Sequence, residues 1–114
     1  MATLPAADRA VIEPEKLRDY VLSSDHEHGR HKARVFMSAL GIDRDGWEYL
    51  REQIATHVVV AEVSEVRTGR YGMRYSVPML IEGLNGQTHE VTTGWIIERE
   101  GAPPRLTSAY VNVP

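Results

Sequence analysis

The chain of 114 residues contains no cysteine. This absence excludes disulfide bridges, thiolate zinc sites and cysteine nucleophiles, and it is compatible with a reducing compartment. No run of residues approaches the roughly 18 apolar residues of a membrane-spanning helix. The first ten residues also lack the basic-then-apolar layout of a secretory signal. We therefore expect no membrane association and a cytoplasmic location.

The chain also lacks an excess of positive charge. Its 13 Lys and Arg residues and 16 Asp and Glu residues give a formal net charge of −3, and its pI is about 5.9. No overall positive field attracts nucleic acid, so any contact with RNA must be local. Phosphate-binding loops, dinucleotide fingerprints and serine nucleophile elbows are absent as well. We therefore expect no cofactor.

The composition is that of an ordinary globular chain, with 42% hydrophobic and 25% charged residues. Such a chain can bury a core and is not expected to be disordered. Its length fits one domain. We expect a single domain over residues 1–114, in which residues 1–11 form a loose N-terminal lead-in.

The first half of the chain carries apolar residues at helical spacing. Pro14 suits the first turn of a helix, which the pattern extends over residues 14–22. A second helix follows the polar residues 23–25. Gly41 is expected to end it, because glycine is typical of the first position after a helix. Its core-facing stripe is Ala33, Phe36, Met37 and Leu40. Asp43 can cap a third helix that continues to about Thr56.

Beyond the third helix the period of the apolar residues changes from 3.6 to 2. Strands are expected over residues 58–66, 73–82, 89–97 and 105–113, with turns at 68–72 and 83–86 and a loop at 101–104. Pro78 cannot donate a ladder hydrogen bond, so it predicts a bulge or an unpaired position. The pattern does not fix which residues of the last strand point inward.

This order predicts an α+β fold with two to three N-terminal helices packed on one face of a four-stranded antiparallel β-meander. The opposite face of the sheet would then be free to bind a ligand. Arg74, Thr92, Arg105 and Thr107 would lie on that face or along its rim. Their side chains are donors suited to phosphate or carboxylate groups.

Potential chemistry is concentrated in residues 24–36, where a polar turn leads into the second predicted helix. Three of the five histidines, His26, His28 and His31, lie here. His26 and His28 could share a metal ion, but His31 is not at clean helical spacing and no acidic partner is fixed. Exposed polar histidines are the simpler explanation, and we expect no bound metal.

His26 together with Lys32 favours acid–base chemistry on RNA. Imidazole titrates near neutrality and can move a proton, and a nearby cation can neutralise a pentacoordinate phosphate. Cleavage through the ribose 2′-hydroxyl needs neither a metal nor a nucleophile from the enzyme. Lys32 lies at the border of the apolar stripe, where a lysine can aim its amine into a neighbouring cleft. The alternative explanation is a solvated loop and helix face.

Three residues of the predicted sheet could also contact a nucleic acid. Trp95 and Tyr110 could stack on bases, but both alternate with apolar neighbours, and core packing is the simpler interpretation. Arg105 follows two prolines, a rigid approach that could fix a functional side chain. An arginine beside a strand start is also commonly a plain surface cation.

A series of short segments adds a family resemblance. The segments are Lys16-Leu17-Arg18-Asp19-Tyr20, His26 with Gly29, Lys32-Ala33-Arg34-Val35-Phe36, Leu40-Gly41, Tyr71-Gly72-Met73-Arg74-Tyr75, Gly94-Trp95-Ile96 and Pro104-Arg105-Leu106-Thr107-Ser108-Ala109-Tyr110. They resemble a bacterial family of uncharacterised small domains, found at the C-terminal tips of polymorphic toxins and as free-standing proteins encoded beside a small partner. The resemblance extends from Ile12 to Val111.

The element order also looks like the barnase, EndoU, colicin and RelE group of metal-independent ribonucleases. This resemblance implies a toxin-like ribonuclease, in which the family's polar motif positions match His26, Lys32, Arg74 and Arg105. Two departures matter. Residues 23, 24 and 27 are not the Asn-Pro and Pro that the family tends to have, which predicts a looser turn, and the acidic pI differs from that of many ribonuclease toxins.

The leading hypothesis is a toxin-like metal-independent endoribonuclease that cleaves RNA by 2′-hydroxyl transesterification. His26 would act as general acid or base, Lys32 and Arg105 would stabilise the phosphorane charge, and Arg74 would hold phosphate. The expected substrate contacts are His31, Thr107 and Tyr110.

Two other classes remain open. The first is a non-catalytic protein-binding module of the immunity or antitoxin type, whose sheet edge or open face docks a small partner. The second is a metal-dependent hydrolase that uses His26 and His28. The RNA target, the partner and the oligomeric state are not specified by the sequence.

Overall fold

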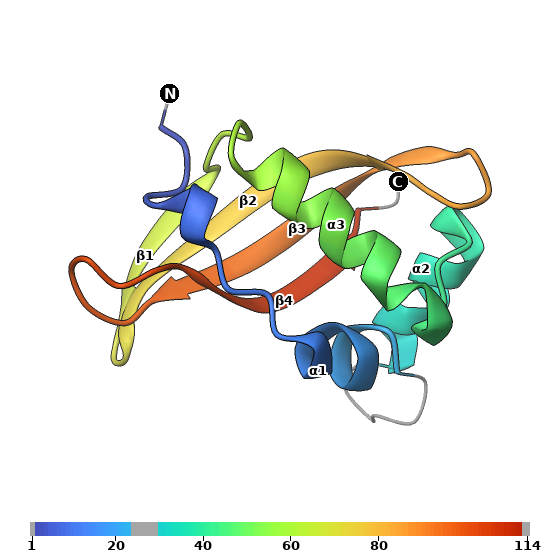
Figure 1. Ribbon diagram of the computed structural model, residues 1–114, viewed down its shortest axis with the longest axis horizontal. Helices are drawn as coiled ribbons and strands as arrows, with labels where there is room; N and C mark the ends of the chain where they lie inside the picture. The colour runs from blue at the N-terminus through green and yellow to red at the C-terminus, as the bar shows by residue number, and fades with distance from the viewer. Residues whose placement is uncertain (1, 24–29, 113–114) are drawn as a thin grey trace.

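The computed structural model describes residues 2–23 and 30–112, except for the side chains of Arg30 and His31. Helices come first along the chain and strands second (Figure 1). The helical half contains α1 (Pro14–Lys16), a π-helical turn (Leu17–Val21), α2 (Arg30–Leu40), a 3₁₀ turn (Arg44–Gly46) and α3 (Trp47–Val58). The strands are β1 (Glu65–Gly69), β2 (Gly72–Glu82), β3 (Thr88–Ile97) and β4 (Arg105–Val111).

The four strands form one antiparallel sheet in the order β1-β2-β3-β4. The helices gather on one side of this sheet, and α3 crosses in front of the strands in Figure 1. The hydrophobic core lies between the two layers. Its largest fully buried side chains include Phe36, Leu50, Ile54, Ile81, Trp95 and Leu106. The arrangement confirms the predicted α+β fold with helices on one face of a four-stranded meander.

The first predicted helix forms, but its second half is wider than an α-helix. After Lys16 the chain passes into the π-helical turn, where the Leu22 N–H donates to the Leu17 carbonyl at 2.8 Å. Pro14 occupies the first helical turn as predicted. None of the described helices is long and apolar enough to cross a membrane.

The second predicted helix ends at the predicted residue. Gly41 has a φ of 66°, a left-handed conformation that glycine adopts at helix ends without strain. The predicted burial of Met37 is wrong. The helical pattern placed this residue in the core stripe, but it is 53% exposed. The buried side of α2 is narrower than predicted and consists of Ala33, Phe36 and Leu40.

The strand predicted over residues 58–66 is wrong except at its end, because α3 continues through Val58 and β1 begins only at Glu65. Val58 lies four residues after Ile54 and eight after Leu50, and all three side chains are fully buried. Packing of this helical stripe overrides the β-propensity of the valine run at 58–60. Asp43 makes no side-chain cap, and the 3₁₀ turn separates it from α3.

The first strand therefore lies later in the chain than predicted. β1 begins at Glu65, and residues 68 and 69, predicted as a turn, pair with Met73 and Gly72 of β2. As a result, Arg67 is a strand residue that lies opposite Arg74. This shift changes which side chains meet on the sheet.

Residues 2–11 are held against the rest of the chain instead of forming a loose lead-in. Leu4 is buried, and the Val63 N–H donates to the Ala2 carbonyl at 2.9 Å. Val11 forms a parallel bridge with Arg105. The N-terminal segment thus attaches to the chain that precedes β1 and to the outer edge of β4.

Pro78 occupies an unpaired position, one of the two predicted outcomes. The Ser64 N–H donates to the Ser76 carbonyl at 2.8 Å, so the backbone groups of Ser76 point toward β1. The backbone groups of successive strand residues point to opposite sides, so those of residues two apart point to the same side. The nitrogen of Pro78, two residues after Ser76, therefore also points toward the β1 side. Pairing with β1 stops at Ser76, so no ladder bond is lost at Pro78.

Trp95 is a core residue, as its apolar neighbours predicted. Its indole N–H donates to the Thr93 hydroxyl at 2.7 Å, and that hydroxyl donates to the Val77 carbonyl at 2.8 Å. Both polar groups are therefore satisfied inside the core, as buried polar groups must be. The indole of Trp95 is 1% exposed, so it is not available for stacking on a base.

Candidate functional site

Arginines form a row across the free face of the sheet, opposite the helices. Arg67 of β1 lies opposite Arg74 of β2, Arg74 lies opposite Ile96 of β3, and Ile96 lies opposite Arg105 of β4. Directly opposed residues project from the same face of a sheet. Like charges in this position destabilise strand pairing. Folding alone therefore gives no reason for the Arg67–Arg74 pair.

A β-bulge in β4 brings two consecutive hydroxyl side chains toward this face. Gly94 of β3 pairs with Ser108, but the next residue, Trp95, pairs with Leu106. Thr107 is the extra residue between these pairs. Because of the bulge, inward-facing residues change parity along β4, which no single alternating pattern could have predicted.

Gly94 leaves open the space beneath these hydroxyl groups. A Cβ atom built on Gly94 would stand 2.8 Å from Ser108 Oγ and 3.2 Å from Thr107 Oγ1. Glycine inside a strand commonly marks such a close approach. The absence of a side chain at this position therefore preserves a floor lined by two hydroxyl groups.

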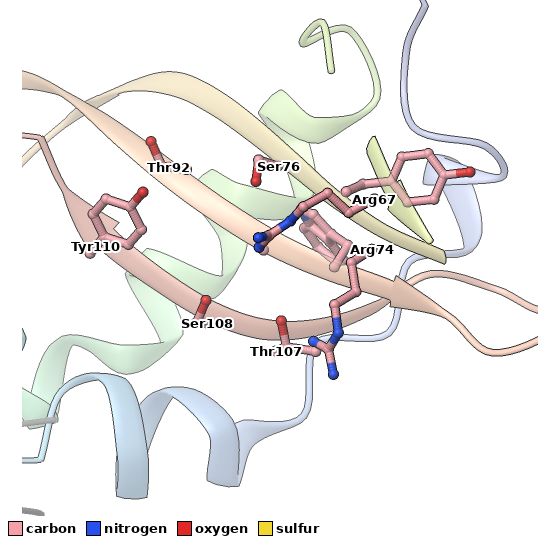
Figure 2. A pocket seen from close by; sticks show the side chains of 10 residues that line it. Arg67, Arg74, Ser76, Thr92, Thr107, Ser108 and Tyr110 are labelled. Carbon is pink, nitrogen blue, oxygen red and sulfur yellow. The ribbon is translucent and has the colours of Figure 1, made fainter. Parts of the chain in front are cut away.

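These features border a depression of about 190 Å³, which we call the open-face hollow. Its polar lining consists of Arg67, Arg74, Ser76, Thr92, Thr107, Ser108 and Tyr110. Figure 2 shows Tyr110 at one end, the two arginines toward the other, and the hydroxyl groups of β2, β3 and β4 between them. No acidic side chain is among the described residues that line it.

The two arginines of the hollow differ in their contacts. Arg67 Nε lies 3.1 Å from Glu65 Oε1, and both side chains are largely exposed. Glu65 is paired with Ser76, so this contact leans Arg67 along the strand toward the middle of the hollow. Arg74 makes no ion pair with any described residue. The charge of Arg74 therefore has no protein counter-ion among the described residues.

Lys32 reaches the rim of the hollow from α2. Its Nζ lies 5.3 Å from the centroid of the Tyr110 ring, within the range of a cation–π contact. Tyr110 is 40% exposed, so its predicted core packing is wrong. After the bulge, the buried residues of β4 are Ala109 and Val111, the two neighbours of Tyr110. The border position of Lys32 on the helix brings its amine to Tyr110. Lys32 is not among the lining residues of the hollow, so its catalytic role stays a prediction.

Arg105 stands apart from the hollow, although it belongs to the same row. Its Nη1 donates to Glu13 Oε1 at 2.7 Å, and its Nε lies 3.6 Å from Glu98 Oε1. The hydrogen bond with Glu13 raises the pKa of Arg105 above its usual value. Arg105 is not among the lining residues, so its catalytic role stays a prediction.

The predicted histidines cannot be placed. His26 and His28 lie outside the described residues, and so does the side chain of His31. Their roles as acid, base, substrate contact or metal ligand stay predictions. Over residues 2–23 and 30–112, no group of three His, Asp or Glu side chains is arranged to hold a metal ion.

The structure brings Arg74, Thr92 and Thr107, which were predicted to lie on the free face or its rim, together with Tyr110. It adds Arg67 and Ser108, which the sequence pattern did not single out. Arg67 was missed because the predicted strand ended at residue 66, and Ser108 because the bulge was not recognised. Gly94 in the middle of a strand was the available signal for the bulge.

The lining of the hollow suits an anionic ligand with a planar group beside it. Guanidinium and hydroxyl groups donate hydrogen bonds to phosphate oxygens, and an exposed tyrosine provides a surface on which bases stack. The hollow is smaller than the roughly 300–1,000 Å³ of pockets that enclose drug-sized molecules. It therefore fits part of an extended ligand better than a whole enclosed one.

A similar fold occurs in a chain of the contact-dependent growth inhibition toxin–immunity protein complex from Klebsiella pneumoniae 342. The TM-score is 0.70 at 15% sequence identity, and the similarity covers 90% of this chain and 99% of that chain. At this identity the similarity shows the fold alone. No curated protein matches the chain. The model of the domain of unknown function DUF6883 matches residues 3–113, and the chain therefore belongs to this family.

Proposed function

We propose that this chain is a toxin-type domain that cleaves RNA without a metal ion. The observation that carries the proposal is the open-face hollow, where two arginines meet several hydroxyl groups and none of the described lining residues is acidic. Such a donor set suits the phosphodiester of a nucleic acid. The fold shared with a chain of a toxin–immunity protein complex supports a toxin-related or immunity-related role.

In the proposed reaction the ribose 2′-oxygen attacks the adjacent phosphorus, and the bond from phosphorus to the 5′-oxygen breaks. A base removes the proton of the 2′-hydroxyl, and an acid protonates the leaving 5′-oxygen. His26 would serve in one of these steps, because imidazole exchanges protons near neutral pH. The products are a 2′,3′-cyclic phosphate and a 5′-hydroxyl end.

The cations near the hollow would stabilise the negative charge that develops on the phosphorane. Arg74 lines the hollow without a described counter-ion, and Lys32 contacts the ring of Tyr110, which lines the hollow as well. Arg105 would join them only after leaving Glu13, because that ion pair holds it outside the hollow. Among these cations, we therefore expect Arg74 to matter most.

The test is cleavage of RNA in the presence of EDTA. We expect the purified chain to degrade transfer RNA or total RNA to fragments with cyclic phosphate ends, and His26→Ala to abolish cleavage. Arg74→Gln should lower kcat/KM by about 10²-fold, as loss of one charge-stabilising donor does. His57→Ala, in the last turn of α3, is the matched control.

Three outcomes would contradict this proposal. Folded protein that leaves a broad set of RNAs intact would show that the domain does not cleave RNA. Cleavage that EDTA stops would favour the metal-dependent hydrolase instead. Unchanged cleavage by Arg74→Gln would place the catalytic site elsewhere on the chain.

A non-catalytic protein-binding module is the second candidate. Its support is that the similar fold occurs in a complex of a toxin with an immunity protein, and that a basic hollow is complementary to an acidic loop. Such a chain would be harmless when expressed and would co-purify with a small protein encoded beside it. A toxic chain whose growth defect a small neighbouring protein relieves would favour the ribonuclease.

A further inference from the structure

We propose that the open-face hollow holds single-stranded RNA at two points: a phosphate against Arg67 and Arg74, and a base farther along the strand against Tyr110. This inference rests on the proposed function, because it names the substrate contacts of that site. It assigns a binding role to Arg67 and a space-preserving role to Gly94. Neither residue was singled out as a site residue from the sequence pattern.

The phosphate point is built from two opposed arginines. Their backbones lie roughly 5 Å apart across the β1–β2 pair. Figure 2 shows the two guanidinium groups pointing in different directions, so the Arg74 side chain, which lies beside Gly69, would rotate for both groups to hold one anion. The side chain of Arg67 is 71% exposed, and it contacts Glu65, whose side chain is 57% exposed. Exposed ion pairs of this kind contribute little, so a phosphate can replace Glu65. Arg74 makes no ion pair within the described residues and needs no such exchange.

Hydroxyl groups of β4 form the floor between the two points. Ser108 Oγ and Thr107 Oγ1 lie over Gly94, and any side chain at this position would press against them. Thr92 adds a third group, since its Oγ1 accepts a hydrogen bond from Asn112 at 2.8 Å and retains its own proton to donate. These donors can bind phosphate or ribose oxygens.

The length of the hollow points to more than an isolated phosphate. The row that contains Arg74 and the row that contains Tyr110 are four residues apart along β3. This spacing is roughly 13 Å at about 3.3 Å per residue. Lys32 contacts the Tyr110 ring at this end. A phosphate at one end and a stacked base at the other require an unpaired strand, because bases inside a duplex are not exposed for stacking.

Binding of an uncleavable strand tests the proposal apart from catalysis. The probe is a short fluorescent 2′-O-methyl RNA oligonucleotide, and fluorescence anisotropy is measured at several salt concentrations. Arg67→Gln and Arg74→Gln should each weaken binding about tenfold and reduce the slope of log K against log salt by roughly 0.7, as loss of one phosphate contact to a single strand does. Arg70→Gln is the matched control, because Arg70 stacks on Tyr71 outside the hollow.

Two further variants test the floor and the base contact. Gly94→Ala should weaken binding of the oligonucleotide, because its methyl group would press against Ser108 Oγ and Thr107 Oγ1. Ser108→Ala removes one hydroxyl group of the floor and tests the same contact if Gly94→Ala fails to fold. Tyr110→Leu should lower the affinity for the oligonucleotide about tenfold, but it should not change the affinity for an abasic strand of the same length. Circular dichroism spectra confirm that each variant is folded.

The outcomes separate this inference from the proposed function. Equal weakening by Arg67→Gln and Arg70→Gln would overturn it, as would full affinity in both Gly94→Ala and Ser108→Ala. If the wild-type chain cleaves RNA while Arg67→Gln cleaves and binds equally well, the function stands and the inference fails. If the wild-type chain binds the probe through these residues but leaves RNA intact, the inference stands and the ribonuclease function fails.

Discussion

The two faces of the sheet use alternate residues of the same strands, yet they differ in every property that bears on stability. On the helix-covered face, Val77, Ile81 and Val91 are fully buried, and the polar groups of that layer are paired internally. On the free face, Arg67 and Arg74 lie opposite each other beside unfilled space. The first arrangement is explained by packing, whereas the second is not.

This difference separates the residues that build the fold from those that remain available to bind a ligand. Burial of apolar side chains drives folding, and the covered face provides it. The free face contains a like-charge pair that weakens strand pairing and a glycine that contributes no packing. Side chains that do not stabilise the fold are better explained by the binding of an anion than by structure.

The largest expected effect on stability comes from the covered face. Ile81→Ala removes a fully buried side chain and should lower the free energy of unfolding by about 2–5 kcal/mol. Its chain neighbour Leu80 projects from the other face and is 65% exposed. Leu80→Ala should therefore change the free energy of unfolding by roughly 0.5 kcal/mol or less. Urea unfolding followed by circular dichroism measures both. Similar losses in the two variants would show that the faces are not energetically distinct.

A smaller loss is expected when an aromatic residue of the covered face is reduced in size. Trp95→Phe removes the N–H that donates to Thr93 and leaves a small cavity, so it should cost about 1–3 kcal/mol of unfolding free energy. Tyr110→Phe on the free face is the matched change, and roughly 0.5 kcal/mol or less is expected. Thermal and urea unfolding test the pair. Equal stability of the two variants would contradict the structural role of Trp95.

No loss of stability is expected from the arginine pair. Arg67→Gln removes a like-charge repulsion with Arg74, so the unfolding midpoint in urea should stay the same or rise slightly. The same variant should lose most of its RNA binding. A clear fall in the midpoint would mean that Arg67 stabilises the fold, and its place in a ligand site would then lose its physical basis.

A small effect is expected in a cluster where two arginines do have an acidic side chain between them. Asp19 accepts hydrogen bonds from Arg18 and Arg44, and these bonds, that of Arg18 first, lower the pKa of Asp19. Its stabilising contribution is therefore present above the ordinary carboxyl pKa of 3.8 and is lost as the pH falls through the lower folded value. Asp19→Asn should slightly lower the thermal midpoint at pH 7.

The pH dependence provides the control for this last change. The difference in midpoint between Asp19→Asn and the wild-type chain should shrink toward zero as the pH is taken below 3.8. A difference that is constant over the whole pH range would show that the side chain acts through packing and not through its charge.

Most of the fold could be predicted because its strongest patterns agree with its packing. The period of 3.6 in the helices and the alternation in β2 and β3 each matched the buried face. The failures occurred where a local preference competed with tertiary contacts. Val58 belongs to a β-prone run, but the stripe begun by Leu50 and Ile54 keeps it in the helix.

Only part of the candidate site could be predicted, and the missing part follows from the same failures. The late start of β1 placed Arg67 opposite Arg74 instead of in a turn. The bulge at Thr107 changed the alternation of β4 and brought Ser108 beside it. Periodicity assumes a regular strand, so it cannot locate a residue that is inserted into one. The pairing of strands far apart in the sequence determines both placements.

The outer half of β2 continues past the end of β1, and no other strand within residues 2–23 and 30–112 pairs with this part of its edge. Such an edge can recruit a strand from another molecule and begin an ordered aggregate. The ring of Pro78 interrupts the row of N–H donors there, and a foreign strand could not form a continuous ladder along it. The chain can therefore keep a long strand beside the hollow while this part of its edge remains a poor template for a foreign strand.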